Sequence, residues 1–131
     1  MIGVLLVEDN KIVRTGLVRL LKERDDIYVA GQAGNGLEAL KLLRGGLQVE
    51  VIIADVNMPI MDGFEFTTKL AQAYPQLPVV ILTMHDKAVF IERAKQAGAR
   101  GYLLKSGQID QLFNAIIAVA NGQEYYPNYN S

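Results

Sequence analysis

The chain has 131 residues, 50% of them hydrophobic and none of them cysteine, which predicts a single folded domain and excludes a disulfide scaffold or any cysteine-based site. Its formal net charge is −1, with both signs scattered along the chain, which argues against a nucleic-acid-binding surface. We find no signal peptide and no apolar run as long as a membrane span, so a soluble, cytoplasmic protein is the expectation.

Five short apolar runs, rich in β-branched residues, alternate with five segments of helical periodicity. The predicted strands are residues 3–7, 27–33, 51–54, 78–82 and 101–104. The helices that follow them are predicted to begin at Asn10, Asn35, Asp62, Lys87 and Gln108. This strict alternation predicts one parallel sheet with helices on both faces and right-handed crossovers.

Local signals indicate where the helices start, where they stop and which side they bury. Asn10 can cap the first helix, and Asn35 with Glu38 forms a capping-box-like pair. Asp62 opens the third helix in the same way, and Gly98 is predicted to end the fourth in a left-handed conformation. The predicted inner faces contain Val13, Leu17, Leu20 and Leu21, then Leu40 and Leu43, then Phe66, Leu70 and Ala73.

Polar residues stand at the end of four of the five predicted strands. They are Glu8 and Asp9 after the first, Asp55 after the third, Thr83 after the fourth and Lys105 after the fifth. The carboxyl ends of parallel strands share one rim, which is where open α/β sheets bind ligands. Each residue alone has an ordinary explanation, such as a helix-capping acid or a solvated lysine. The whole set at one rim predicts a functional site.

The chemistry of this set suggests a metal-assisted phosphoryl site. Two unit charges ~4 Å apart cost about 4 kcal/mol at an effective dielectric of ~20, so clustered carboxylates favour a bound cation. Ligands that are all oxygen suit Mg²⁺. Asp55 is then the predicted nucleophile, which would become an aspartyl phosphate. Lys105 can pair with a carboxylate or a phosphoryl oxygen, and the hydroxyl of Thr83 can donate to another phosphoryl oxygen.

Four motifs carry a resemblance to a known family. They are V-L-L-V-E-D-N at 4–10, I-A-D-V-N-M-P-I-M-D-G at 53–63, L-T-M-H at 82–85 and G-Y-L-L-K at 101–105. With them, over residues 2–122, the chain resembles a response-regulator receiver domain of bacterial two-component systems. The resemblance implies a flavodoxin-like (βα)5 doubly wound sheet of strand order 2-1-3-4-5, a fold that the residues alone do not specify in this detail.

The resemblance also implies roles for individual residues. Asp55 would accept a phosphoryl group from a sensor histidine kinase, and Glu8, Asp9, Asp55 and the backbone carbonyl of Asn57 would bind Mg²⁺. Thr83 and Lys105 would couple phosphorylation to a change of conformation, and Tyr102 would move with Thr83 as a switch. His85, two residues after Thr83, is interpreted as a rim residue that at most tunes the access of water to the phosphoryl group.

Further segments resemble the NarL/FixJ (LuxR-type) subfamily. Many receiver domains have a proline after the lysine; members of this subfamily often do not, and here Ser106 occupies that position. They are A-G-N-G-L-E-A-L at 33–40, A-G-A-R-G-Y-L-L-K-S at 97–106 and A-V-A-N-G-Q-E-Y-Y-P at 118–127. Residues 1–122 are expected to form the receiver domain and residues 123–131 a tail or the start of a linker. In this subfamily the linker usually leads to a helix-turn-helix domain that regulates transcription. The chain is expected to be either an excised receiver or a natural single-domain receiver that acts by binding proteins.

Two other classes of protein share part of this pattern. A haloacid-dehalogenase-type phosphatase needs a second aspartate two residues after the first, where this chain has Asn57. A flavodoxin needs a Ser/Thr/Gly-rich loop after the first strand, where this chain is acidic. Signalling without enzymatic turnover is therefore expected, without direct DNA binding by this chain. The last helix is apolar on more than one face, through Ile109, Leu112, Phe113, Ile116, Ile117 and Val119. The surplus apolar surface suggests a phosphorylation-dependent homodimer formed through this region; the alternative is that the fourth helix or the tail covers it.

Overall fold

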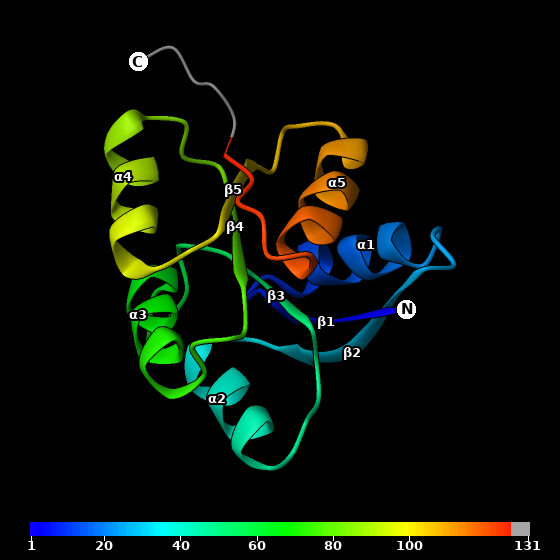
Figure 1. The fold of residues 1–131 in the computed structure, drawn as a ribbon, viewed down its shortest axis with the longest axis horizontal. Helices are drawn as coiled ribbons and strands as arrows, with labels where there is room; N and C mark the ends of the chain where they lie inside the picture. The colour runs from blue at the N-terminus through cyan, green and yellow to red at the C-terminus, as the bar shows by residue number, and fades with distance from the viewer. Residues whose placement is uncertain (127–131) are drawn as a thin grey trace.

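The computed structural model describes residues 1–126, and within them the ten predicted elements occur in the predicted order. The strands are β1 (Ile2–Val7), β2 (Ile27–Ala33), β3 (Val51–Ala54), β4 (Val79–Thr83) and β5 (Gly101–Leu104). The helices are α1 (Lys11–Leu21), α2 (Gly36–Arg44), α3 (Gly63–Ala73), α4 (Ala88–Ala97) and α5 (Ile109–Ala120). All strands are parallel in the order β2-β1-β3-β4-β5 (Figure 1), so the predicted fold class is confirmed. Tyr129 and the rest of residues 127–131 lie outside the described part of the chain.

The sheet is the middle layer of three, and its two faces carry separate cores. Helices α1 and α5 cover one face, and α2, α3 and α4 cover the other (Figure 1). Neighbouring residues of each strand point to opposite faces, so that Leu5 joins the core under α2 to α4 while Leu6 joins the core under α1 and α5. Burial on both sides explains why the strands read as continuous apolar runs. Among the described residues, no helix is both long enough and apolar enough to cross a bilayer.

The predicted helix caps are present, with one difference in detail. The side-chain oxygen of Asn10 accepts hydrogen bonds from two backbone N–H groups of α1, and Asn35 and Asp62 each accept one from the helix that they cap. Glu38 reaches back to the N–H of Gly34, at 2.6 Å, and so bonds the residue before the cap instead of the cap itself. Gly98 has a φ of 102° and ends α4 in the left-handed conformation, as predicted.

Three predictions need correction: the bounds of one strand and the burial of two helix residues. Strand β4 runs one residue later than predicted, because the N–H of Lys105 donates to the carbonyl of Thr83 at 2.8 Å and so carries the pairing with β5 to Thr83. Ala73 is exposed, because Tyr74, four residues after Leu70, takes the inner position at the end of α3. Leu20 is 37% exposed, because it lines the groove between α1 and α5, whereas Leu21 is buried in the core.

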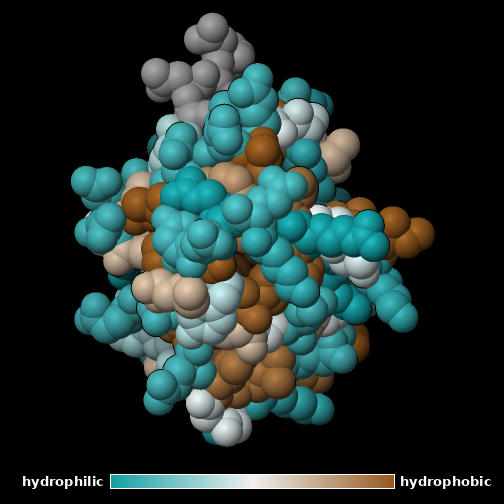
Figure 2. All heavy atoms as spheres, turned by 90° about the vertical axis from the view of Figure 1, so that its right-hand side faces the viewer, coloured by the Kyte–Doolittle hydropathy of each residue, from teal (hydrophilic) through white to brown (hydrophobic). Residues whose placement is uncertain are grey.

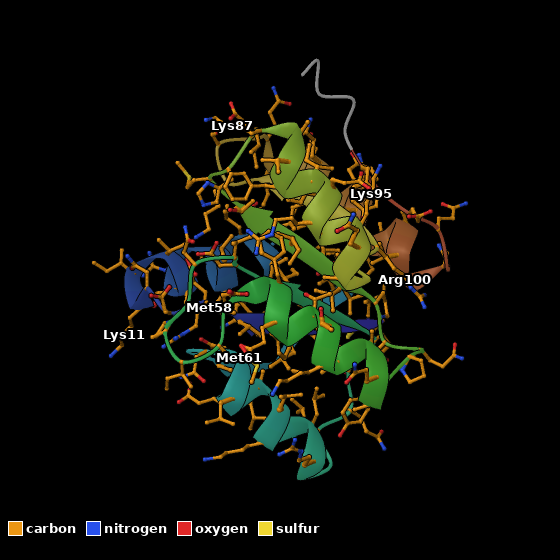
Figure 3. The ribbon with its side chains drawn as sticks, turned by 90° about the vertical axis from the view of Figure 1, so that its left-hand side faces the viewer. Lys11, Met58, Met61, Lys87, Lys95 and Arg100 are labelled. Carbon is orange, nitrogen blue, oxygen red and sulfur yellow. The ribbon has the colours of Figure 1, made fainter. Side chains whose placement is uncertain are left out.

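The loop between β3 and α3 contains the sole non-glycine residue with a positive φ in the described chain, Ile60 at 72°. The N–H of Met61 donates to the carbonyl of Pro59 at 2.7 Å, which closes a three-residue γ-turn around Ile60. A β-branched residue is strained in this region, and Ile60 is also 76% exposed. Met58, just before the turn, and Met61, its last residue, are both buried, so packing at both ends holds the loop in place (Figure 3).

Residues after α5 extend the sheet beyond β5. Tyr125 forms a parallel bridge with Gly101, and its carbonyl accepts from the N–H of Tyr102 at 3.0 Å. The hydroxyl of Tyr126 donates to the carbonyl of Ala99, and the ammonium of Lys95 on α4 lies 4.8 Å from the ring of Tyr126. Burial raises the pKa of the Tyr126 phenol. This end of the described chain is therefore fastened both to the edge of the sheet and to α4, where Figure 3 labels Lys95.

Candidate functional site

The carboxyl ends of four strands bring the predicted rim residues into one place. Val7 pairs with Ala54, so the next residues of β1 and β3, Glu8 and Asp55, are neighbours. Thr83 is the last residue of β4, and Lys105 follows β5 directly. The convergence follows from the parallel topology and not from any contact local in sequence.

Three carboxylates form the floor and lip of this site. One carboxylate oxygen from each of Glu8, Asp9 and Asp55 lies within 4.8 Å of the others. Glu8 is 2% exposed and Asp55 8% exposed, whereas Asp9 faces solvent. An ion or a phosphoryl group would therefore enter past Asp9 and meet the two buried carboxylates beneath it.

Lys105 supplies a positive charge that is bonded directly to two of these carboxylates. Its Nζ donates to Oε1 of Glu8 at 2.6 Å and to Oδ2 of Asp55 at 2.9 Å. Burial alone would lower the pKa of Lys105, but its hydrogen bonds and charge pairing with the two carboxylates outweigh burial, and the net shift is upward. The ammonium group thus remains charged between them.

Glu8 is the residue that this pairing leaves incomplete. Burial raises the pKa of Glu8 more than the hydrogen bond from Lys105 lowers it, and the charge of Asp55 adds to the rise. Among the described residues, its second oxygen, Oε2, is buried without a hydrogen-bond partner. One ammonium group for three carboxylates, with a buried oxygen left unbonded, fits a site whose donors are all oxygen and which would accept a divalent cation.

The backbone holds Asp55 tightly. Its N–H donates to the carbonyl of Val7 at 3.2 Å, and its Oδ1 accepts from the N–H of Val56 at 2.7 Å. Gly63 packs directly on this backbone, since a Cβ atom at Gly63 would lie 2.2 Å from the carbonyl oxygen of Asp55. The sequence marked Gly63 as the start of a helix and gave no sign of this close approach.

Thr83 and Tyr102 both contact the loop that follows β4. Thr83 is fully buried, and its Oγ1 accepts from the N–H of His85 at 3.3 Å. The hydroxyl of Tyr102, also fully buried, donates to the carbonyl of His85 at 2.6 Å. The two predicted switch residues therefore bond the backbone N–H and the backbone carbonyl of the same residue, His85.

The side chain of His85 links this loop to Asn57. Its Nε2 lies 3.0 Å from Nδ2 of Asn57, and its ring stacks on Phe90 of α4 with the centroids 4.2 Å apart. These two contacts join the loop after β3, the loop after β4 and α4. The sequence interpretation gave His85 a small role and did not foresee this contact between two loops.

Arg14 is a further residue of the site that sequence reasoning missed. Its Nη1 donates to the backbone carbonyl of Glu8 at 2.7 Å. Arg14 lies on α1, in the position of an ordinary half-exposed helix arginine. A contact that reaches back six residues to a loop carbonyl leaves no signal in hydrophobic periodicity.

A separate apolar groove lies between α1 and α5. It has a volume of about 240 Å³ and is lined by residues that include Val13, Leu17, Leu20, Ile109 and Leu112. Figure 2, which faces this side of the molecule, shows hydrophobic side chains exposed among polar ones in the middle of the face. Of the six apolar α5 residues named from the sequence, only Ile109 and Ile117 are not fully buried, so the predicted surplus of apolar surface is smaller than expected.

Comparison with known proteins agrees with this geometry. Residues 4–117 match the family model described as response regulator receiver domain. The chain is 41% identical over 125 residues to the response regulator GacA of Pseudomonas aeruginosa, and 38% identical to UvrY of Escherichia coli K12. It covers 58% and 57% of the length of those two proteins. A LuxR-family two-component response regulator from Aurantimonas sp. SI85-9A1 superposes with a TM-score of 0.90 at 32% identity, over 95% of this chain and 89% of that one.

Proposed function

The chain belongs to the response regulator receiver family, and from this premise we propose that Asp55 accepts a phosphoryl group from a sensor histidine kinase. The observation that carries the proposal is the position of Asp55, which is nearly buried at the rim and bonded to Lys105 at 2.9 Å. An oxygen of Asp55 would bond phosphorus while the bond from phosphorus to the nitrogen of the kinase's phosphohistidine breaks, with its electron pair returning to the imidazole. The chain acts as a signalling element and not as a turnover enzyme.

Mg²⁺ is the cation proposed for the acidic site. Glu8, Asp9 and Asp55 would bind it through carboxylate oxygens, and Asn57 through its backbone carbonyl. When bound, the cation would neutralise the charge that otherwise keeps a phosphate dianion away from Asp55. The residues of the chain supply the remaining functions: Lys105 holds Asp55 in place, and Val56 orients its other oxygen.

Removal of the metal tests this assignment. We expect the mass of the protein to rise by one phosphoryl group after incubation with acetyl phosphate and Mg²⁺, and to stay unchanged when EDTA replaces Mg²⁺. The reason is the repulsion between the carboxylate cluster and the phosphate donor, which Lys105 alone does not cancel. Intact-mass spectrometry makes the measurement, and equal phosphorylation in EDTA would contradict a role for the metal.

Thr83 and Tyr102 are proposed to carry the change of conformation. The hydroxyl of Thr83 would leave the N–H of His85 and donate to the phosphoryl group, which would loosen the loop that Tyr102 also bonds. Phosphorylation shifts such an equilibrium only through contacts that differ between the two states. Thr83→Ala removes this contact and leaves Asp55 intact.

We therefore expect Thr83→Ala to accept a phosphoryl group without any change at Tyr102. NMR chemical shifts of Tyr102, recorded with and without the phosphoryl mimic beryllofluoride, provide the readout. Thr68→Ala is the matched control, since the hydroxyl of Thr68 donates only within α3, to the carbonyl of Phe64. In this variant the NMR shifts of Tyr102 should move as in the wild type. A full shift of Tyr102 in Thr83→Ala would show that the coupling takes another route.

The output is proposed to be association of two copies, with any DNA contact made by residues outside this chain. The net charge of −1, with both signs scattered along the sequence, argues against a DNA-binding surface, and a phosphoryl group adds negative charge. The groove between α1 and α5 is the proposed contact, which places the dimer in the helix-5 region. A haloacid-dehalogenase activity is not favoured, because Asn57 occupies the position of the required acid and bonds His85.

Sedimentation velocity tests the association. With beryllofluoride present, we expect the wild-type protein to sediment as a dimer and the Leu20→Glu variant to sediment as a monomer. The reason is that Leu20 lines the groove and is 37% exposed. Ile12→Glu is the control on the same helix: Ile12 is 84% exposed, lies outside the groove and should leave the dimer intact. A wild-type monomer in both states, or salt-sensitive binding of duplex DNA, would contradict the proposal.

A further inference from the structure

Arg14 holds the peptide unit that joins two of the acidic residues. The carbonyl that accepts its 2.7 Å hydrogen bond belongs to the peptide between Glu8 and Asp9. This unit is planar and includes the Cα atoms of both residues. With the N–H of Glu8 held by the sheet, a fixed carbonyl direction fixes the ψ angle of Glu8 and so limits how the two acidic side chains leave the backbone relative to each other.

The sheet fixes the backbone only up to this point. The N–H of Glu8 donates to the carbonyl of Ala33 at 3.0 Å, and the carbonyl of Val7 accepts from Asp55 at 3.2 Å. Pairing between neighbouring strands thus orients β1 as far as the N–H of Glu8. The next carbonyl, that of Glu8, is oriented by the side chain of Arg14 instead of by a neighbouring strand.

We propose that Arg14 is a positioning residue for the divalent-cation site formed by Glu8, Asp9 and Asp55. The inference rests on the proposed function, since it concerns the same site. Arginine suits this role because it is always charged and has several donors in a rigid plane. Groups that orient metal ligands typically change metal affinity by about 10- to 100-fold when they are removed.

The charge of Arg14, taken alone, would have the opposite effect on the affinity for Mg²⁺. A guanidinium group near three carboxylates opposes the entry of a divalent cation, so loss of its charge alone would tighten Mg²⁺ binding. Loss of the hydrogen bond to Glu8 would weaken binding, because the two adjacent carboxylates would no longer be held in register. The sign of the change in affinity therefore separates a positioning role from a purely electrostatic one.

The test is a titration of the 131-residue chain with Mg²⁺, followed by the NMR shifts of the backbone amides of Asp9 and Val56. We expect the dissociation constant of Arg14→Met to rise about 10-fold. Arg14→Lys, which keeps the charge and a donor, should fall between Arg14→Met and the wild type. Arg19→Met changes an exposed arginine on the same helix and should match the wild type. At saturating Mg²⁺, the phosphorylation rate of Arg14→Met should return to the wild-type value.

Unchanged or tighter Mg²⁺ binding by a folded Arg14→Met protein would overturn the proposal. Urea unfolding establishes that each variant is folded, and Arg14→Gln replaces Arg14→Met under the same criterion if the latter does not fold. A wild-type protein whose Asp9 and Val56 amides do not respond to Mg²⁺ would refute the proposed function itself. That result differs from wild-type binding that Arg14→Met leaves unchanged, which refutes this inference alone.

Discussion

Asp55→Asn should gain no phosphoryl group from acetyl phosphate and Mg²⁺ under conditions in which the wild-type protein gains one. The substitution keeps the size of the side chain but replaces the nucleophilic carboxylate with an amide. The hydrogen bond from the N–H of Val56 can persist, so the local backbone should be retained. The loss is expected to be complete, because the one other described carboxylate that is both buried and bonded to Lys105 is Glu8, which is proposed as a metal ligand. Intact-mass spectrometry gives the result directly.

The control for Asp55→Asn is an aspartate nearby that lies outside the carboxylate cluster. Asp86 is exposed in the loop after β4, and Asp86→Asn should be phosphorylated as the wild type is. Peptide mapping of the labelled wild-type protein should place the group within residues 51–63. Equal labelling of Asp55→Asn and the wild type would show that another residue is the acceptor.

Gly63→Ala should impair phosphorylation almost as severely, although Gly63 carries no functional group. Its added Cβ atom would lie 2.2 Å from the carbonyl oxygen of Asp55 and 2.9 Å from Cα of Val56, and both are backbone atoms that cannot rotate away. Either Asp55 or the start of α3 must move. A displacement of about 1 Å at a reacting group can cost on the order of 100-fold in rate. Overpacking should also lower the free energy of unfolding by about 1–3 kcal/mol.

Gly16→Ala is the matched control, because Gly16 lies within α1 and has nothing within 4 Å of the position of its Cβ atom. We expect this variant to keep the wild-type phosphorylation rate and to gain about 0.5–1 kcal/mol in the free energy of unfolding. Urea unfolding and time-resolved mass spectrometry measure the two quantities. A Gly63→Ala protein that is phosphorylated at the wild-type rate would show that the loop after β3 adapts without moving Asp55.

The parts of the site that the sequence predicts are those that depend on the order of strands and helices. Glu8, Asp55 and Lys105 each follow a buried apolar run directly, so once the runs are strands of one parallel sheet, the three residues lie at the same rim. Composition and periodicity specify the runs clearly. The strand order came instead from the family resemblance, because alternation of strands and helices is compatible with more than one order.

The parts that the sequence does not predict depend on loop conformation. The contact between Asn57 and His85, the close approach of Gly63 and the reach of Arg14 all join residues whose relative positions are set by turns. Turn geometry of this kind, such as the positive φ of Ile60, has no periodic signature in the sequence. Four of the six apolar residues of α5 are buried, because a helix that lies over a wide parallel sheet buries a broad face and not only a narrow stripe of side chains.

The bridge between Tyr125 and Gly101 also bears on aggregation. The outer strand of a sheet presents unpaired N–H and C=O groups to which another chain can add. At β5 the residues after α5 occupy part of this edge. At the opposite edge the pairing of β1 with β2 shifts register between Val4 and Leu5, and this irregularity makes β2 a poorer template. A chain cut before residue 124 would lose the first of these protections, and its β5 edge would become the place where insoluble, strand-paired assemblies begin.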